Sequence, residues 1–309
     1  MMIKEHESLA PKTTMRIGGD ARYFAELETK EDVEKAYEFA QKKNIPLIAL
    51  GAGSNTIFAD GEINALVVRI KANAVKIEGN KITVEAGKNL AQLVNELAEN
   101  GLDLSPLTGI PGTVGGAVFG NAGQGPKGIW IDSFIENVEV FENKSWKIFL
   151  KDQCKFGYRD SIFKWKMEQP SLSAEADELR PSRSGKWKVR VIWKVKFNIP
   201  KENPVTIKNN IETLLRKRIS SQPFAKTAGS CFTVSSDGTP AWQLIDKAGL
   251  RGLKIGGVKI SEKHANFLIN DKGGNLEDVI KIIETVKDRI PNVGEVEMRL
   301  FGENGQHIC

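Results

Sequence analysis

The feature that most constrains the fold of this 309-residue chain is a glycine-rich stretch near its middle. Eight of the twenty residues from Gly109 to Gly128 are glycine, and most of the others are small or apolar. A flexible linker would be richer in serine, glutamate and lysine. The composition therefore predicts backbone that packs closely against something flat or anionic.

A second glycine loop, Gly51-Ala52-Gly53-Ser54-Asn55, follows an apolar run at 45–50 that predicts a buried strand. The turn after such a strand can present free backbone N–H groups to an anion. Gly51 and Gly53 would let the backbone approach closely, and Ser54 and Asn55 would add side-chain donors. The alternative is an ordinary turn, and the downstream glycine stretch favours the binding site.

Familiar nucleotide motifs do not account for these loops. Residues 123–128 fit G-x-G-x-x-G, but they follow no apolar strand and open no amphipathic helix, so a Rossmann fingerprint is rejected. The sequence also contains no P-loop pattern.

Composition narrows the class of protein. The length suggests two or three domains, and no apolar run approaches the roughly 20 residues of a membrane span. Three scattered cysteines and three histidines favour neither a disulfide framework nor a metal site, so no metal is predicted. The net charge of +5 suits an anionic small ligand. These features predict a reduced, cytoplasmic location.

Local patterns predict alternating helices and strands. Helices are expected at 29–44, where Thr29 and Asp32 form a capping box, and at 90–100, 207–218, 276–289 and through 242–246. Strands are expected at 45–50, 65–70, 75–78, 81–85, 135–141, 146–150, 187–197, 266–270 and 294–301. Residues 167–185 read as a polar surface insertion, and Asn203-Pro204 as a domain boundary.

Several polar groups are candidates for chemistry, each with a structural alternative. Alternation would place Glu295, Glu297 and Arg299 on one face of the last strand. The structural alternative is an ordinary half-exposed strand, which shows the same alternation. Residues 158–161 (Tyr-Arg-Asp-Ser) place four polar side chains next to one another, which suggests either the polar lining of a binding pocket or a hydrogen-bond network that supports the fold. Ser230 lies in a turn of small residues that is not a nucleophile elbow, and a lone His264 is more often structural.

Taken in order, these strings resemble the UDP-N-acetylenolpyruvoylglucosamine reductase family along nearly the whole chain. The matching segments are 14–19, 50–55, 109–117, 121–123, 158–163, 228–230, 248–252, 256–257, 264–267 and 295–299. The resemblance implies an α+β fold, with a two-lobed FAD-binding module of the vanillyl-alcohol-oxidase-like (PCMH) type and a C-terminal α+β substrate-binding domain. The implied divisions are 1–70 and 71–200 for the lobes and 201–309 for the substrate domain, whose last strand returns to the active site.

The resemblance also implies the cofactor site and the reaction. FAD would be held by a set of residues from both loops, namely Gly51, Gly53, Ser54, Asn55, Gly112, Thr113, Gly115, Gly116 and Asn121. A hydride would pass from NADPH, by way of FAD, to the enolpyruvyl double bond of a UDP-sugar.

The same resemblance assigns catalytic roles to Arg159, Ser230 and Glu297. Arg159 and a protonated Glu297 would stabilise the enolate-like state, and Ser230 would deliver the proton. Tyr158, Arg159 and His264 would contact the substrate. The chain would act in peptidoglycan precursor synthesis as a monomer, without nucleic-acid or membrane partners.

The chain departs from the family pattern at Lys12, at 124–127 and at 231–234 after Ser230, where Lys-Asn-Pro is common. Its only tyrosines are Tyr23, Tyr37 and Tyr158, so it resembles the branch without a tyrosine-bearing loop. Two alternatives stay open. One is another FAD oxidoreductase with the same module, and the other is a nucleic-acid-binding protein that uses the basic strand 187–197, for which no recognition element is evident.

Overall fold

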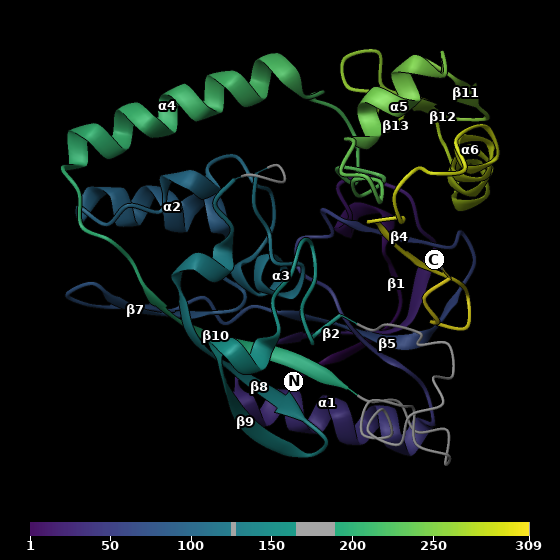
Figure 1. Cartoon of the computed structure of the whole chain (residues 1–309). Helices are drawn as coiled ribbons and strands as arrows, with labels where there is room; N and C mark the ends of the chain where they lie inside the picture. The colour runs from purple at the N-terminus through teal and green to yellow at the C-terminus, as the bar shows by residue number, and fades with distance from the viewer. Residues whose placement is uncertain (125–127, 165–188, 309) are drawn as a thin grey trace, which may run out of the picture.

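The computed structural model describes residues 1–124, 128–164 and 189–308, and it has mixed α and β structure, as predicted (Figure 1). The predicted insertion at 167–185 lies outside the described residues, as do Trp187 and Lys188 of the predicted basic strand. Within the described part of the chain, no helix is both long and apolar enough to cross a membrane.

The first sheet is built entirely from the N-terminal part of the chain. Its order is β1-β2-β5-β3, with β1 antiparallel to β2 and the other pairs parallel. The strands are β1 Ile3–Ser8, β2 Asp20–Leu27, β3 Leu47–Ala49 and β5 Ile63–Ile70. Helix α1, Lys30–Lys43, has the predicted capping box of Thr29 and Asp32 and packs its apolar stripe against this sheet.

The second sheet is antiparallel, in the order β6-β7-β10-β8-β9. Its strands are β6 Val75–Glu78, β7 Lys81–Glu85, β8 Ile135–Glu142, β9 Ser145–Leu150 and β10 Arg190–Asn198. The hairpin across Gly79-Asn80 is confirmed. On β10, Arg190 pairs with the buried Glu142 and Lys196 pairs with the partly exposed Glu136, so both cations have carboxylate partners within the chain, which argues against a phosphate-binding strip.

Helix α2, Leu90–Glu99, is amphipathic as predicted, and Gly101 follows it in the left-handed conformation. A short helix not expected from the sequence, α3 Val114–Phe119, interrupts the glycine stretch. Glycines disfavour helix, but the Thr113 side chain caps Gly116, and Gly115 N–H bonds to the Ala86 carbonyl. Tertiary contacts thus impose the helix. Short 3₁₀ helices occupy Ala10–Lys12, Ser105–Leu107, Ile131–Phe134 and Lys151–Cys154.

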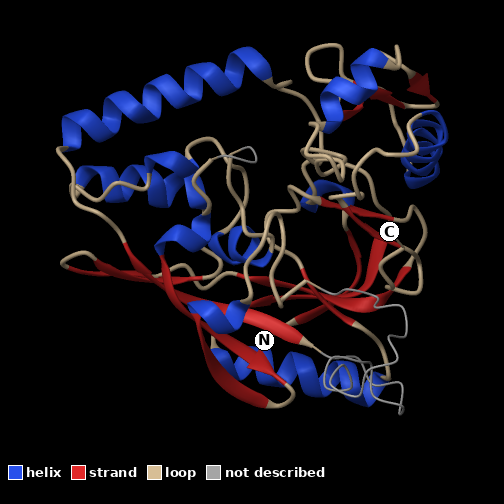
Figure 2. Cartoon of the chain, in the orientation of Figure 1, coloured by secondary structure: helices blue, strands red, loops and turns tan. Residues whose placement is uncertain are grey.

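The C-terminal part begins with α4, Pro204–Ser221, which lies alongside α2 and leads to a small antiparallel sheet (Figures 1 and 2). That sheet contains β11 Lys254–Ile255, β12 Val258–Ile260 and β13 Leu268–Asn270, accompanied by α5 Ala241–Lys247 and α6 Leu276–Arg289. Buried apolar residues of this part form one cluster with those of the first sheet, for example Val279 with Phe24.

The last strand is shorter than predicted. Regular strand is confined to β14, Arg299–Phe301, which runs parallel to β4, Thr56–Phe58, and not over 294–301. The reason is that the backbone of Glu295 and Glu297 bonds instead to Thr233 and Cys231. The alternation itself holds, since Met298 and Leu300 are buried. This pairing carries the chain end back to the first glycine loop.

Candidate active site

The two glycine loops meet each other directly. Ser54 Oγ donates a hydrogen bond to the Pro111 carbonyl at 3.1 Å. A Cβ added at Gly51 would lie 2.8 Å from Thr113 Oγ1, and one added at Gly112 would lie 3.1 Å from Ser54 Oγ. Glycine is therefore needed here so that the loops can pack against each other.

The backbone donors of both loops are available to a ligand. The N–H groups of residues 51–55, and those of Gly112 and Thr113, have no acceptor among the described residues. Successive free N–H groups in a turn form a concave site that favours anions such as a pyrophosphate. Near this site, Arg69 Nε and Thr108 Oγ1 are the buried side-chain polar atoms of the described chain that lack a partner. This donor set fits a dinucleotide such as FAD.

The side-chain amides of Asn55 and Asn121 hold the two loops in place. Asn55 Nδ2 donates to the Glu297 carbonyl at 3.0 Å, which ties the first loop to the last strand. Asn121 Nδ2 donates to the Gly157 carbonyl at 2.9 Å, which ties the glycine stretch to the Arg159 turn. The two asparagines thus connect the loops to the segments that carry the charged candidates.

Arg159 and Glu297 form a partly desolvated ion pair. Arg159 Nε lies 3.2 Å from Glu297 Oε1, and the Glu297 side chain is only 12% exposed. Burial raises the pKa of Glu297, and the nearby charges of Arg159 and Lys164 oppose that rise. Glu295 is exposed, so the two glutamates differ in environment although both were predicted to lie on one face.

Ser230 lies on a segment that is hydrogen-bonded to the Glu297 strand. Glu297 N–H donates to the Cys231 carbonyl at 2.8 Å, and Ser230 bridges to Phe267. The side-chain amide of Asn266 bonds to both backbone groups of Phe232: it accepts a hydrogen bond from Phe232 N–H at 2.9 Å and donates one to the Phe232 carbonyl at 2.8 Å. No role for Asn266 was predicted from the sequence.

Besides Arg159, the predicted substrate contacts are Tyr158 and His264. Tyr158 packs on Trp130 with ring centroids 4.9 Å apart, and burial, together with the nearby Glu297 carboxyl, raises its pKa. His264 packs on Phe267 at 4.8 Å, and burial lowers its pKa, so the ring is held in its neutral form. Asn266 N–H donates to His264 Nδ1 at 3.3 Å. His264 therefore helps to order the turn that supports Ser230.

Further cations surround the ion pair, and their grouping was not predicted. Burial lowers the pKa of Arg218 and of Arg299 to about 10 in each case. Arg299 lies between the rings of Phe119 and Phe301, at 4.6 and 4.7 Å. Lys164 lies close enough to Glu297 to lower its pKa. These residues give the site a positive character that suits anionic ligands.

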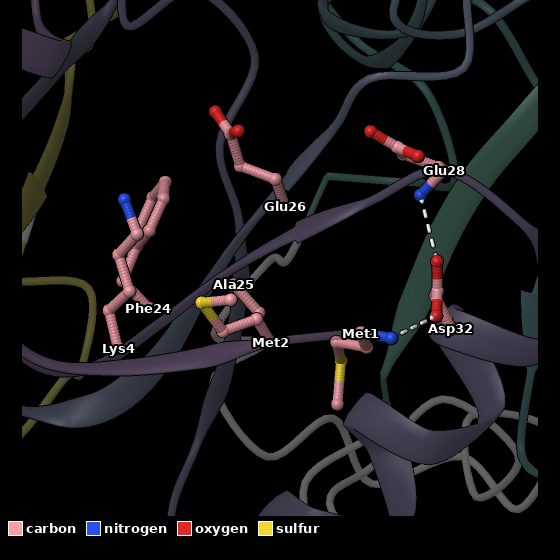
Figure 3. A pocket seen from close by; sticks show the side chains of 8 residues that line it. All are labelled: Met1, Met2, Lys4, Phe24, Ala25, Glu26, Glu28 and Asp32. Carbon is pink, nitrogen blue, oxygen red and sulfur yellow. Dashed lines mark hydrogen bonds and ion pairs between the residues drawn. The ribbon is translucent and has the colours of Figure 1, made fainter.

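A separate pocket of about 280 Å³ lies on the first sheet, away from these loops, among Met1, Lys4, Phe24 and their neighbours (Figure 3). One of its three acidic lining residues, Asp32, pairs with the Met1 ammonium at 2.9 Å and accepts a hydrogen bond from Glu28 N–H at 3.1 Å. None of the predicted site residues lines it.

The loops and the buried ion pair define a cofactor-binding enzyme site, and comparison with known proteins gives its class. A model of an FAD binding domain matches residues 21–144, and a model of the UDP-N-acetylenolpyruvoylglucosamine reductase C-terminal domain matches residues 222–300. The chain is thus an FAD-binding oxidoreductase, and the predicted type of flavin module is confirmed.

Similarity over the full length gives the family. UDP-N-acetylenolpyruvoylglucosamine reductase of Chlamydia felis is 33% identical over 95% of this chain and 92% of its own length. The enzyme of Anoxybacillus flavithermus is 32% identical over 96% and 92%. The crystal structure of the Thermus caldophilus enzyme has a TM-score of 0.78 at 29% identity, covering 97% of this chain and 98% of that one. The chain belongs to the UDP-N-acetylenolpyruvoylglucosamine reductase family, as the sequence motifs predicted.

Proposed function

We propose that this protein catalyses the NADPH-dependent reduction of the enolpyruvyl ether of UDP-N-acetylglucosamine-enolpyruvate to UDP-N-acetylmuramate, for peptidoglycan precursor synthesis. The observation that carries the proposal is the buried pair of Arg159 and Glu297, 3.2 Å apart, beside the Ser230 segment. The names of the full-length relatives describe a reductase of this sugar nucleotide, which supports the same substrate.

The cofactor would be held mainly by backbone groups. The free N–H groups of residues 51–55 and of Gly112 and Thr113 would bind the FAD pyrophosphate. Gly115 lets α3 pack closely against Ala86 just after β7, because a Cβ at Gly115 would come within 2.8 Å of the Ala86 side chain. The chemistry that FAD supplies when bound is hydride transfer, from NADPH to the terminal carbon of the double bond.

Protein side chains would then stabilise the negative charge that forms on the substrate and supply the proton that is added to it. Addition of a hydride at the terminal carbon leaves carbanion character beside the substrate carboxylate. Arg159 would stabilise that negative charge, and Glu297 would assist as a buried acid whose pKa is raised by burial. The Ser230 hydroxyl would give its proton to the carbon next to the carboxylate. Serine is a weak acid, so it would recover that proton from water or a neighbouring group.

The arrangement of sheets supports a division of labour along the chain. Residues 1–70 and 71–200 would be the two FAD-binding lobes, since each contains one sheet, and residues 201–309 would bind the substrate. Tyr158 and His264 would contact the substrate.

The test is an assay of the FAD-loaded protein with NADPH and UDP-N-acetylglucosamine-enolpyruvate. NADPH oxidation should depend on the sugar nucleotide and yield UDP-N-acetylmuramate, identified by its mass. An enzyme that oxidises NADPH at the same rate with and without that substrate would instead be a different FAD oxidoreductase.

A further inference from the structure

Lys164 contacts the backbone of Arg159, whose guanidinium pairs with Glu297. Its Nζ donates a hydrogen bond to the Arg159 carbonyl at 2.5 Å. The lysine backbone is itself fixed, because its N–H bonds to the Ser161 carbonyl at 3.1 Å and Ser161 Oγ donates to the Phe119 carbonyl at 2.7 Å. The ammonium is thus held in place from α3.

Arg159 needs such support because its backbone is strained. Its φ of +54° is in the left-handed region, which residues other than glycine rarely adopt. The turn is closed by Gly157 N–H to the Asp160 carbonyl at 3.0 Å and by the reverse bond at 3.2 Å. The Arg159 carbonyl points out of this pair of bonds and is the one that Lys164 binds.

The charge of Lys164 also acts on Glu297. The Glu297 carboxyl faces the Arg159 guanidinium and the Lys164 ammonium, both of which lower its pKa, while burial raises it. Tyr158 also interacts with Glu297, and Asp160 with Lys164. Arg299, the first residue of β14, follows Glu297 two residues later in the chain. A removed lysine charge would therefore leave Arg159 as the principal cation that keeps the Glu297 pKa from rising further.

We propose that Lys164 is a positioning residue of the reaction: its Nζ holds the Arg159 turn in the conformation that presents the guanidinium to Glu297, and it supplies the second positive charge that faces this carboxyl. The inference rests on the proposed function, because it takes Arg159 and Glu297 as groups that touch the reacting substrate. Lys164 itself acts through them.

Three variants of the FAD-loaded enzyme separate the two parts of this role. Lys164→Arg keeps the donor and the charge, Lys164→Gln keeps a donor without charge, and Lys164→Met keeps neither. For each, flavin re-oxidation by UDP-N-acetylglucosamine-enolpyruvate is followed under single turnover from pH 5.5 to 9.5, next to flavin reduction by NADPH and the thermal unfolding temperature.

The Met variant should re-oxidise its flavin about ten- to a hundredfold more slowly at neutral pH, because the Arg159 guanidinium would no longer be held in its orientation toward Glu297. The loss of rate at high pH, where Glu297 gives up its proton, should move to higher pH in both the Met and the Gln variants. Only the Met variant should show the full loss of rate. The Arg variant should restore both the rate and the pH profile, and flavin reduction by NADPH should change little in all three.

Three outcomes would overturn the inference. If the wild-type enzyme is active but the pH profile is unshifted in the Met and Gln variants, the inference about Lys164 is refuted and the proposed function stands. Equal slowing of both half-reactions together with a lowered unfolding temperature would mean that Lys164 only supports the fold. A wild-type flavin that the sugar nucleotide does not re-oxidise would refute the proposed function first, and this inference with it.

Discussion

The Asn55 side-chain amide donates a hydrogen bond to the Glu297 carbonyl at 3.0 Å, and the Arg299 N–H donates to the Asn55 carbonyl at 2.9 Å. One residue of the first glycine loop therefore holds the last strand from two directions. Because the N–H groups of the same loop are the ones proposed to bind the cofactor, the position of the Glu297 carboxyl would be coupled to the cofactor site.

The protein should purify with about one FAD per chain and show the visible absorbance of oxidised flavin. Gly51→Val should weaken FAD binding at least tenfold, because its side chain would meet Thr113 Oγ1 at the loop junction. Titration of apoprotein with FAD measures the change, and the unfolding temperature of both apoproteins controls for misfolding. Colourless wild-type protein that FAD cannot reconstitute would contradict the assignment.

Ser230→Ala should leave flavin reduction by NADPH nearly intact and slow flavin re-oxidation by the enolpyruvyl sugar nucleotide by orders of magnitude. Both half-reactions need the flavin, but only the second needs a proton at carbon. Stopped-flow absorbance resolves the two steps. Equal slowing of both would show that Ser230 serves the structure of its turn.

Glu297→Gln should reduce substrate-driven flavin re-oxidation by about a hundredfold or more, because it removes the acid and keeps the shape. Glu295→Gln is the matched control. Glu295 is exposed and its carbonyl, not its side chain, bonds to Thr233 N–H, so the effect should be much smaller. Comparable losses under single turnover, or a larger one at Glu295, would transfer the role to the other glutamate.

His307 should make the protein less stable in acid. Burial, together with the charges of Arg299 and Lys164, lowers its pKa from 6.5 to about 4. The unfolded chain binds this proton more readily, so stability is fully present above pH 6.5 and decreases as the pH falls towards 4. Each unit of lowered pKa corresponds to about 1.4 kcal/mol.

The corresponding variant is His307→Gln, which should lose part of this pH dependence. Unfolding free energies of both proteins at pH 7.5, 6 and 5 measure it. Parallel curves for the two proteins would show that His307 does not contribute.

Asn266→Ala should destabilise the protein by about 2–4 kcal/mol, since it leaves the buried N–H and carbonyl of Phe232 without their partner. Asn95→Ala is the control, because its amide bonds to the Ala91 carbonyl on the exposed side of α2, and its effect should stay within about 0.5 kcal/mol. Denaturant unfolding compares them. Equal small effects would mean that the Ser230 turn is held by other contacts.

Elements governed by neighbouring residues could be predicted well. The capping box of Thr29 and Asp32 starts α1, and Asn44 ends it in the left-handed conformation. The hairpin across Gly79-Asn80 and the amphipathic α2 also formed as expected. Each depends on side chains within one or two turns of one another, so the relevant free energies are already written in short segments.

Other features could not be predicted, because they depend on partners far away in the chain. The glycines of α3 oppose a helix locally, and contacts with 86–88 impose one. Ser54, Asn55 and Asn121 are predicted cofactor-binding residues, and the sequence does not indicate that their side-chain donors also bond to Pro111, Glu297 and Gly157. Lys164 carried no local signal, since its significance lies in the strained carbonyl of Arg159 and the carboxyl of Glu297.

By itself, the sequence determined the family, the flavin module, and most helices and strands, because motifs and periodicity are local and collinear. Only the tertiary structure decided which side chains of those motifs meet. The parallel pairing of β14 with β4 places Glu297 against Arg159 and the Ser230 segment. Such contacts join residues that are distant in the chain, and the free energy of burying and pairing them exists only once the whole chain has folded.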